Sequence, residues 1–518
     1  MFNVKQAKKP VIKKVLEPVK EPPKKKPLPQ RHPSLSTPAQ ALARDAARRS
    51  PAVKSRPTTN GHSNGLKPRS KPSPAVRTPA PLKRKRPGTP LQVLSSDSEG
   101  DDDFSTDGEV KRRKQAPKVD SLEPDTRRDI WTTSTLVSAE DIGALIHGAD
   151  LTSGKHKAAT GIGPELFNPA FGIAEGEEVP VLELQYPSAA PPERFQLVYP
   201  KDGSEYRPLY DIVDTIEAIL THYFPPSQSA TLTDESTGIP RRLRVAFKAV
   251  NLSDFRAVVD EFNTLMRTSL KDGTIIKHLS TLHQVPITLI ERILECQTYE
   301  RTIAPHVAEL KVPKKDLKET KNNVYGEIKP RFAHDIFRET KLRSGQVFID
   351  LGSGVGNVAV QAALETGAES WGIEIMPKPA MYAVHQKHEF EARCKLWGIR
   401  PGAANLVTGD FLASPEIDNV LKRADVVLVN NRVFEADLNN KLVMKFLDLK
   451  EGCQIVSLEP FVTKDHKISE RNSWDPKNLL RFVKEMHYGS DRVSWSNDPG
   501  EWWMAVKDSE PMRKFGLV

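Results

Sequence analysis

The chain has 518 residues and a formal net charge of +9, but the charge is distributed very unevenly. Residues 1–90 contain 23 Lys and Arg against 3 Asp and Glu, 17 of the 42 prolines and a single aromatic residue, Phe2, whereas residues 91–518 sum to −11. A segment of that composition cannot bury a core, which excludes both a uniformly folded chain and a basic fold, and it predicts a disordered, basic, Pro-rich tail over residues 1–125.

Two short basic clusters lie in or next to this tail, at residues 83–86 and 111–114. Such runs are typical of segments that nuclear import receptors bind, and they can also be plain solvated charge. Between them, "SSDSEGDDD" at 95–103 is either a substrate for an acid-directed kinase or a disordered spacer. Of these alternatives, we favour nuclear import for the basic clusters.

The cysteines and the hydropathy of the sequence limit the cellular compartments in which the protein is expected. Cys296, Cys394 and Cys453 lie far apart without a Cys-x-x-Cys pair, so neither a disulfide framework nor a zinc site is indicated, and no metal is expected. The sequence has no run of 18 apolar residues and no signal-peptide pattern. We therefore expect an intracellular protein of the cytosol or nucleus.

Residues 126–330 are predicted to be the mostly helical N-terminal part of the folded region. Residues 181–199 favour short strands or an extended loop, and apolar residues then recur at helical spacing over 209–220. A second helix is predicted to open at Ser253, and a third to run from Pro286 to Leu294. These stripes are assigned to the core.

Residues 331–518 are predicted to form an α/β domain. The apolar runs "QVFIDL", "WGIEI", "ANLVTGD", "ADVVLVN" and "CQIVSLE" alternate with helical patterns from residue 346 onward. That alternation indicates a parallel sheet with right-handed crossovers. Ligands bind such sheets at the carboxyl ends of the strands, so functional side chains are expected there.

The first of these strands ends in a glycine turn. Gly352, Gly354 and Gly356 alternate after Asp350, whereas a dinucleotide fingerprint requires its third glycine where Asn357 stands. A triphosphate loop is excluded as well, because no Gly-Lys-Ser/Thr follows. The pattern predicts a tight turn whose backbone approaches a ligand closely.

Polar residues also follow the next three strands. Glu374 suits a ribose diol, and we favour ligand holding over general acid–base catalysis for it and Asp350. Asp410 and Phe411 suit an adenine, although Phe411 is equally explained as core. Asn430 can orient an amine.

The motifs "VYGE" (324–327), "DLGSGVGNV" (350–358), "GDF" (409–411), "VNN" (429–431) and "VSW" (493–495) occur in an order that resembles the disruptor-of-telomeric-silencing family. The resemblance covers roughly residues 200–510. It implies a seven-stranded Class I methyltransferase (Rossmann-like) sheet, preceded by a helical subdomain, that uses S-adenosylmethionine to methylate lysine 79 of histone H3 in nucleosomes, with a role in chromatin silencing.

The resemblance also implies site residues. Cofactor contacts are implied for Tyr325, Gly326, Glu327, Asp350, Gly352, Gly354, Gly356, Asn357, Glu374, Asp410, Phe411 and Asn430. Catalytic roles at the lysine channel are implied for Asn430, Tyr325, Trp495 and Trp502. Where the family commonly has a tyrosine pair, this chain has Trp502 and Trp503. No phenolic hydroxyl can therefore act there, and an indole can line the channel instead.

Methyl transfer to an amine requires alignment and a neutral lysine, which a dry aromatic channel favours. His334, His385 and His388 are therefore expected to be ordinary helix residues. The tail is expected to bind the DNA phosphates of a nucleosome, or else to act only as a solubilising segment. A nuclear monomer is expected. The rival functions are a catalytically weak chromatin-binding scaffold and a methyltransferase for another protein or a small amine.

Overall fold

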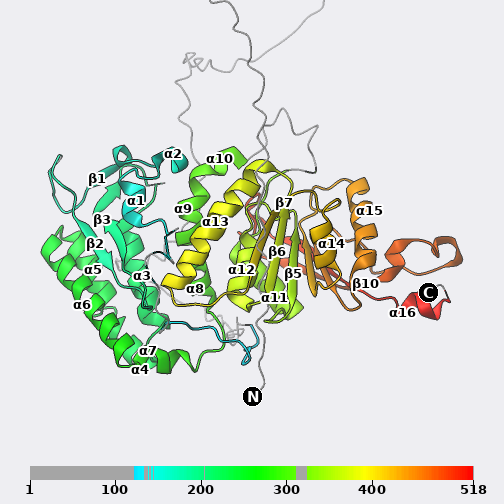
Figure 1. Ribbon diagram of the computed structural model, residues 1–518, viewed down its shortest axis with the longest axis horizontal. Coiled ribbons are helices and arrows are strands. Elements are labelled where there is room, and N and C mark those ends of the chain that lie inside the picture. Colours follow the sequence, from blue (N-terminus) through cyan, green and yellow to red (C-terminus); the bar gives the residue numbers. More distant parts are fainter. Residues whose placement is uncertain are drawn as a thin grey trace, which may run out of the picture. The chain divides into compact units, whose positions relative to one another are not determined.

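The computed structural model describes residues 122–516, apart from residues 134–137, 139, 141, 144, 175, 204, 311–321 and 323. Lys83–Val518 form one compact unit, to which all described residues belong (Figure 1). Nearly all of the predicted tail lies outside the described residues, as do its basic clusters and the serine–acid run. Among the helices that the structure describes, none is long and apolar enough to cross a membrane.

The N-terminal part of this unit is mostly helical, with two small antiparallel sheets that pair β1 with β4 and β2 with β3. Its elements are α1 (Gly148–Thr152), α2 (Lys157–Thr160), η1 (Pro164–Leu166), β1 (Phe167–Pro169), β2 (Val181–Leu184), β3 (Glu193–Gln196), β4 (Val198–Pro200), α3 (Pro208–His222), α4 (Pro226–Leu232), α5 (Ile239–Lys248), α6 (Leu252–Lys271), α7 (Thr274–Leu279), α8 (Ile287–Glu291), η2 (Arg292–Tyr299), α9 (Glu300–Thr302), η3 (Ala304–His306) and α10 (Val307–Leu310).

The predicted helix over 209–220 is confirmed as α3, which begins at Pro208. The start predicted for α6 at Ser253 is wrong by one residue, because Asn251 caps the helix by accepting a hydrogen bond from the backbone N–H of Asp254. The helix predicted from Pro286 continues past Leu294, since α8 runs into the π-helix η2.

The C-terminal part is a seven-stranded sheet between helices. Its elements are α11 (Pro330–Thr340), β5 (Val347–Leu351), α12 (Asn357–Thr366), β6 (Glu369–Glu374), α13 (Pro377–Leu396), β7 (Ala404–Thr408), α14 (Pro415–Leu421), β8 (Val426–Val429), α15 (Ala436–Lys445), η5 (Phe446–Asp448), β9 (Gln454–Ser457), η6 (Glu470–Asn472), η7 (Pro476–Leu479), β10 (Leu480–Tyr488), β11 (Gly500–Lys507) and α16 (Glu510–Lys514).

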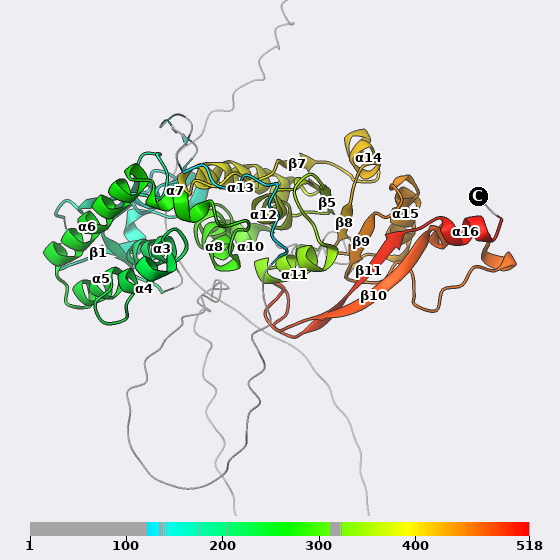
Figure 2. The same cartoon turned by 90° about the horizontal axis from the view of Figure 1, so that it is seen from below.

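The strand order is β10-β11-β9-β8-β5-β6-β7. Strands β5 to β9 are parallel, and β11 lies antiparallel between β9 and β10. Figure 2 shows β10 and β11 as the two longest strands, side by side. The α/β class and the seven-stranded Class I methyltransferase sheet predicted from the sequence are confirmed.

Both faces of the sheet are covered, which explains why β5 has no exposed residue. Phe348 points to the side of α11 and α12, where it meets Phe337. Its neighbour Ile349 points to the opposite side and belongs to the core under α14 and α15. Because β5 is central, its carboxyl end is held rigidly at the edge where the site forms.

One of the hydrophobic core clusters spans the predicted boundary at residue 330. It joins α3 residues such as Ile216 to Leu364 on α12 and Trp397 after α13. A set of buried charged residues, the buried ionic cluster, crosses the same boundary. Its members are Glu193, Asp211, Arg292, Arg301, Glu389 and Arg393. The helical part is therefore packed against the sheet domain through both apolar and ionic contacts.

Residues 122–133, the N-terminal strap, run along the end of α12 that faces away from its glycine turn. The Arg128 guanidinium donates to the backbone carbonyls of Leu364 (2.7 Å) and Glu365 (2.8 Å). The carboxylate of Asp125 accepts a hydrogen bond from the backbone N–H of Ser344 (3.2 Å), and Leu122 packs against the core. Packing therefore begins a few residues before the predicted end of the tail at 125.

Candidate active site

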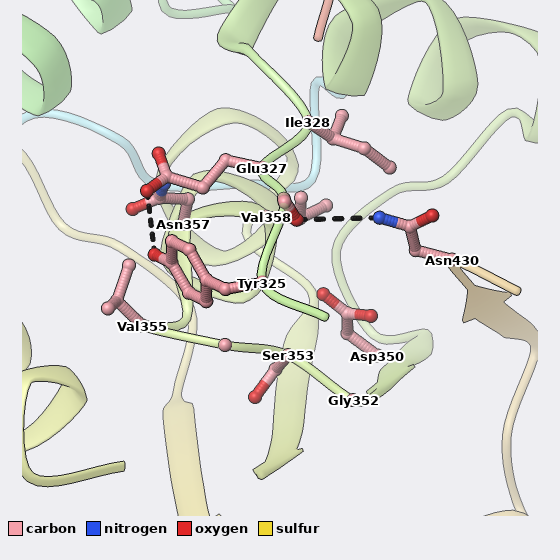
Figure 3. Close-up of a pocket in the computed structure, with 12 residues that line it drawn as sticks. Tyr325, Glu327, Ile328, Asp350, Gly352, Ser353, Val355, Asn357, Val358 and Asn430 are labelled. Atoms are coloured by element: carbon pink, nitrogen blue, oxygen red, sulfur yellow. Dashed lines mark hydrogen bonds between the residues drawn. The ribbon is translucent and has the colours of Figure 1, made fainter. Parts of the chain in front are cut away.

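A pocket lies at the carboxyl ends of β5 and β8, under the loop that precedes α11 (Figure 3). The empty space in it is about 340 Å³, part of which is open to solvent. It is lined by Tyr325, Gly326, Glu327, Ile328, Asp350, Gly352, Ser353, Gly354, Val355, Asn357, Val358 and Asn430. The structure thus brings together eight of the predicted site residues, and adds Ile328, Ser353, Val355 and Val358, whose apolar or small side chains gave no functional signal.

Asp350, the penultimate residue of β5, is 4% exposed, with its carboxylate directed into the pocket (Figure 3). Within the described part of the chain it has no hydrogen-bond or ion-pair partner. Burial, and then the neighbouring Glu374, raise the pKa of Asp350 to about 7. A buried carboxylate without a partner is unfavourable, so this position favours a cationic ligand.

The glycine turn forms the floor of the pocket with its backbone. Gly352, Gly354 and Gly356 all have left-handed φ values, of 89°, 57° and 86°. At Gly354 the restriction is double, because a Cβ would also lie 3.0 Å from the Tyr325 ring. The turn then leads into α12, whose N-cap is Gly356.

Glu374, at the end of β6, fastens this turn from the side. One carboxylate oxygen accepts from the backbone N–H of Gly354 (2.9 Å) and the other from that of Met376 (2.7 Å). Burial raises the pKa of Glu374. Glu374 is not among the lining residues, and its bonds hold the turn to the start of α13.

Residues 324–328, the lid segment, cover the pocket and are fastened to the "VSW" segment. The backbone N–H of Glu327 donates to Ser494 Oγ (2.8 Å), and the backbone N–H of Ser494 donates to the Glu327 carbonyl (2.9 Å). Ile328 and Val493 form an antiparallel bridge. Two motifs that are far apart in the sequence therefore form one rim of the pocket.

Trp495 and Asn430 meet at Gly326 on this rim. Asn430 Nδ2 donates to the Gly326 carbonyl (3.4 Å), and a Cβ at Gly326 would lie 2.6 Å from Cε3 of Trp495. Trp495 is 39% exposed. The next residue, Asn431, is buried and fully used by hydrogen bonds to Asn439, Leu458 and Glu459. Only the first asparagine of the pair faces the pocket.

The expectation that Trp502 lines a channel is not met. Its side chain is 2% exposed in the core, with its ring 5.8 Å from that of Phe332 on α11. The cause is the alternation of β11, which turns Trp502 to the covered face and leaves Trp503 on the other.

The adenine assignment also receives no support from the lining of this pocket. Asp410 Oδ1 accepts from the backbone N–H of Leu412 (2.8 Å), closing its own turn. Phe411 belongs to the core cluster under α14 and has Phe434 as an aromatic neighbour.

The three helix histidines lie away from the pocket lining, which contains none of His334, His385 and His388. His334 is paired with Glu365 in the core. That these histidines have no catalytic role stays a prediction.

A family model described as histone methylation protein DOT1 matches residues 299–507 of this chain. The H3 lysine-79-specific histone-lysine N-methyltransferase of Aspergillus fumigatus is 44% identical over 513 residues, which cover 98% of this chain and 96% of that protein. The proteins of the same description from Emericella nidulans and Gibberella zeae are 42% and 37% identical, and the matches cover 85% and 83% of their lengths.

A solved RNA methyltransferase from Salinibacter ruber, in complex with S-adenosyl-L-homocysteine, matches 34% of this chain and 91% of its own. The identity is 20% and the TM-score 0.23, which is too distant a likeness to support a conclusion about function.

Proposed function

Because the chain belongs to the DOT1 family of histone methylation proteins, we propose that it transfers methyl groups from S-adenosylmethionine to lysine 79 of histone H3 in nucleosomes. The observation that carries the proposal is the buried Asp350 carboxylate, which has no partner in the described structure and lies between a left-handed glycine turn and a fastened lid.

The residues of the pocket fit S-adenosylmethionine. Its α-amino group is the cation that Asp350 lacks, and the turn at Gly352 and Gly354 leaves backbone free for its carboxylate. Tyr325 and Glu327 close over the methionine part. Glu374 takes the ribose hydroxyls with the lone pairs that its two backbone bonds leave available. Gly326, Gly356 and Asn357 shape the surrounding loop, and Asp410 with Phe411 remains the proposed adenine end.

When bound, S-adenosylmethionine supplies a methyl group on a positively charged sulfur. The chain's own task is to align the lysine amine with that methyl and to keep the amine neutral. Asn430, held at Gly326, orients the amine, while Trp495 supplies an aromatic wall. A largely apolar approach disfavours the ammonium form and lowers the lysine pKa. Trp502 contributes by packing in the core against Phe332.

The remaining proposals concern the binding partners, cellular location and oligomeric state of the protein. The substrate is the nucleosome, and the basic residues before 91 bind its DNA phosphates without reading sequence. The basic clusters at 83–86 and 111–114 direct the protein to the nucleus through an import receptor. We also propose that the enzyme acts as a monomer.

The test is a parallel assay of the full chain with labelled S-adenosylmethionine and, separately, nucleosomes, free histones and small amines. Methylation of nucleosomes at lysine 79 of H3, absent from nucleosomes that carry Arg at that position, is expected. Binding of nucleosomes without methyl transfer would instead indicate a scaffold, and methylation of small amines alone would indicate a small-molecule enzyme.

A further inference from the structure

Tyr299 lies outside the pocket lining but is bonded to the lid segment. Its hydroxyl donates to Oε1 of Glu327 (2.9 Å). The same oxygen accepts from Tyr325 (2.6 Å), and Oε2 accepts from Asn357 Nδ2 (3.0 Å). The Glu327 carboxylate therefore joins three segments: the end of η2, the lid itself and the start of α12.

The backbone that presents Tyr299 is a π-helix. Arg292 and Gln297 of η2, five residues apart, both donate to Asp211 and Thr215 on α3. Residues five apart are separated by about 140° around an α-helix, whereas the wider π-helical turn places them nearly over each other. The wide turn is thus what lets both side chains reach α3, and Tyr299 is the residue that ends it.

Tyr299 is also fixed by apolar packing. Its half-buried ring packs against a cluster that contains Ile303, Val355 and Tyr382, together with Tyr325 of the lid. Burial, and then the charge of Glu327, raise the pKa of Tyr299 above its ordinary value. The hydroxyl consequently remains a hydrogen-bond donor throughout the pH range in which the enzyme can be assayed.

We propose that Tyr299 is a positioning residue that sets the place of Glu327, and through it the closed position of the lid over S-adenosylmethionine. The inference rests on the proposed function and adds a residue to it from outside the pocket. Tyr299 also connects the lid to the buried ionic cluster, since Arg292 at the other end of η2 is paired with Asp211. The helical part of the chain is thereby connected to the pocket through η2, Tyr299 and Glu327.

The test compares Tyr299→Phe with wild type in the full chain, by calorimetric titration with S-adenosylmethionine. Loss of a hydrogen bond to a charged group is expected to weaken binding about tenfold. The turnover rate on nucleosomes at saturating S-adenosylmethionine should change less than about twofold, because the hydroxyl acts on binding and not on the amine. Tyr382→Phe is the matched control, since it removes a hydroxyl from the same cluster that is not bonded to Glu327.

A double-mutant cycle separates positioning from general support of the fold. In a Glu327→Ala background, which removes both carboxylate oxygens, Tyr299→Phe should have little further effect on S-adenosylmethionine affinity, whereas a purely structural effect would persist. Hydrogen–deuterium exchange of the unliganded chain gives a readout independent of binding: Tyr299→Phe should increase exchange in residues 324–328 and leave α13 unchanged.

Unchanged affinity of Tyr299→Phe, or an equal loss in Tyr382→Phe, would overturn the positioning role while leaving the methyltransferase intact. Unchanged hydrogen–deuterium exchange in the lid segment would also overturn the positioning role, even if Tyr299→Phe were less stable than wild type. Failure of the wild-type chain to bind S-adenosylmethionine at all would overturn the proposed function itself, and this inference with it.

Discussion

Asp350 and Glu374 lie at the carboxyl ends of two neighbouring parallel strands, but only Glu374 is held by hydrogen bonds from the backbone of other residues. Glu374 accepts two backbone N–H groups, from Gly354 and Met376. Asp350 accepts none from the described residues, and burial followed by the charge of Glu374 raises its pKa to about 7. Two backbone hydrogen bonds therefore use part of the acceptor capacity of Glu374, whereas Asp350 has no partner among the described residues.

Asp350→Asn should weaken S-adenosylmethionine binding by about 2–3 kcal/mol, as expected when a hydrogen bond to a charged group is removed. In wild type the affinity should fall as the pH drops below about 7, because protonation removes the charge that attracts the amino group. The variant should show a flatter dependence between pH 6 and 8. Calorimetric titration across this range checks both, and an equally steep profile in Asp350→Asn would assign the titration to another group.

The same substitution should stabilise the unliganded protein at alkaline pH. The folded pKa of about 7 lies above the ordinary value of 3.8, so the folded state binds the proton more tightly and loses stability as the pH rises through this interval. Asp350→Asn should recover on the order of 1–4 kcal/mol at pH 8 and much less near pH 4. Urea unfolding at the two pH values measures the difference, and a loss of stability at pH 8 would argue against an unpaired buried charge.

Gly326→Ala should lower turnover on nucleosomes at least tenfold, because its Cβ would lie 2.6 Å from the Trp495 ring and displace either the ring or the lid. Gly489→Ala is the control, since a Cβ there meets nothing within 4 Å and the backbone conformation is ordinary. Steady-state kinetics of both variants checks the prediction. Full activity of Gly326→Ala would show that the packing of Trp495 on the lid is not needed for alignment.

Arg301→Met should destabilise the protein by about 3–5 kcal/mol, because it leaves Glu193 and Asp211 short of a partner in a fully buried cluster. The exposed pair Arg242–Glu261 offers the comparison, and Arg242→Met should cost less than about 1 kcal/mol. Equilibrium unfolding in urea gives both values. Similar losses for the two variants would mean that the buried ionic cluster contributes no more than a surface pair.

Deleting residues 1–121 should weaken nucleosome binding and flatten its salt dependence, by about 0.9 in log–log slope for each phosphate that the tail no longer neutralises. Affinity for S-adenosylmethionine should not change, because the N-terminal strap remains in place. A longer deletion to residue 133 also removes the bonds of Arg128 to α12 and should lower the melting temperature. If deletion of residues 1–121 left the salt dependence of nucleosome binding unchanged, nuclear import would be the remaining proposed role of the tail.

The sheet could be predicted from the sequence because each of its parallel strands is marked by a short run of neighbouring apolar residues. A strand such as β5 is covered on both faces, so an unbroken apolar run is followed directly by Asp350 and the glycines. The carboxyl end of the strand then fixes which residues meet at the site. For the same reason Asp350, Gly352, Gly354, Asn357 and Asn430, at or just after strand ends, line the pocket. The lining residues of the lid segment, Tyr325, Gly326 and Glu327, are implied only by the family resemblance.

The features that escape sequence reasoning depend on contacts between distant segments. The hydrogen bond between Glu327 and Ser494 joins residues 167 positions apart, and no hydrophobic periodicity in the sequence predicts it. Likewise, nothing in "VNN" distinguishes Asn430, which faces the pocket, from Asn431, which fastens two loops. The expected place of Trp502 is wrong because the sequence pattern does not predict β11 as a strand, so its alternation could not be used.

If the tail binds DNA as proposed, the position of the N-terminal strap sets where that tether joins the folded part of the chain. The strap is bonded to the carboxyl end of α12, and the pocket lies at the amino end of this ten-residue helix, about 15 Å away. A tail bound to DNA as proposed would extend from this anchor and leave the pocket uncovered. Such a tether would raise the effective concentration of the enzyme at one nucleosome, which favours repeated methylation over dissociation.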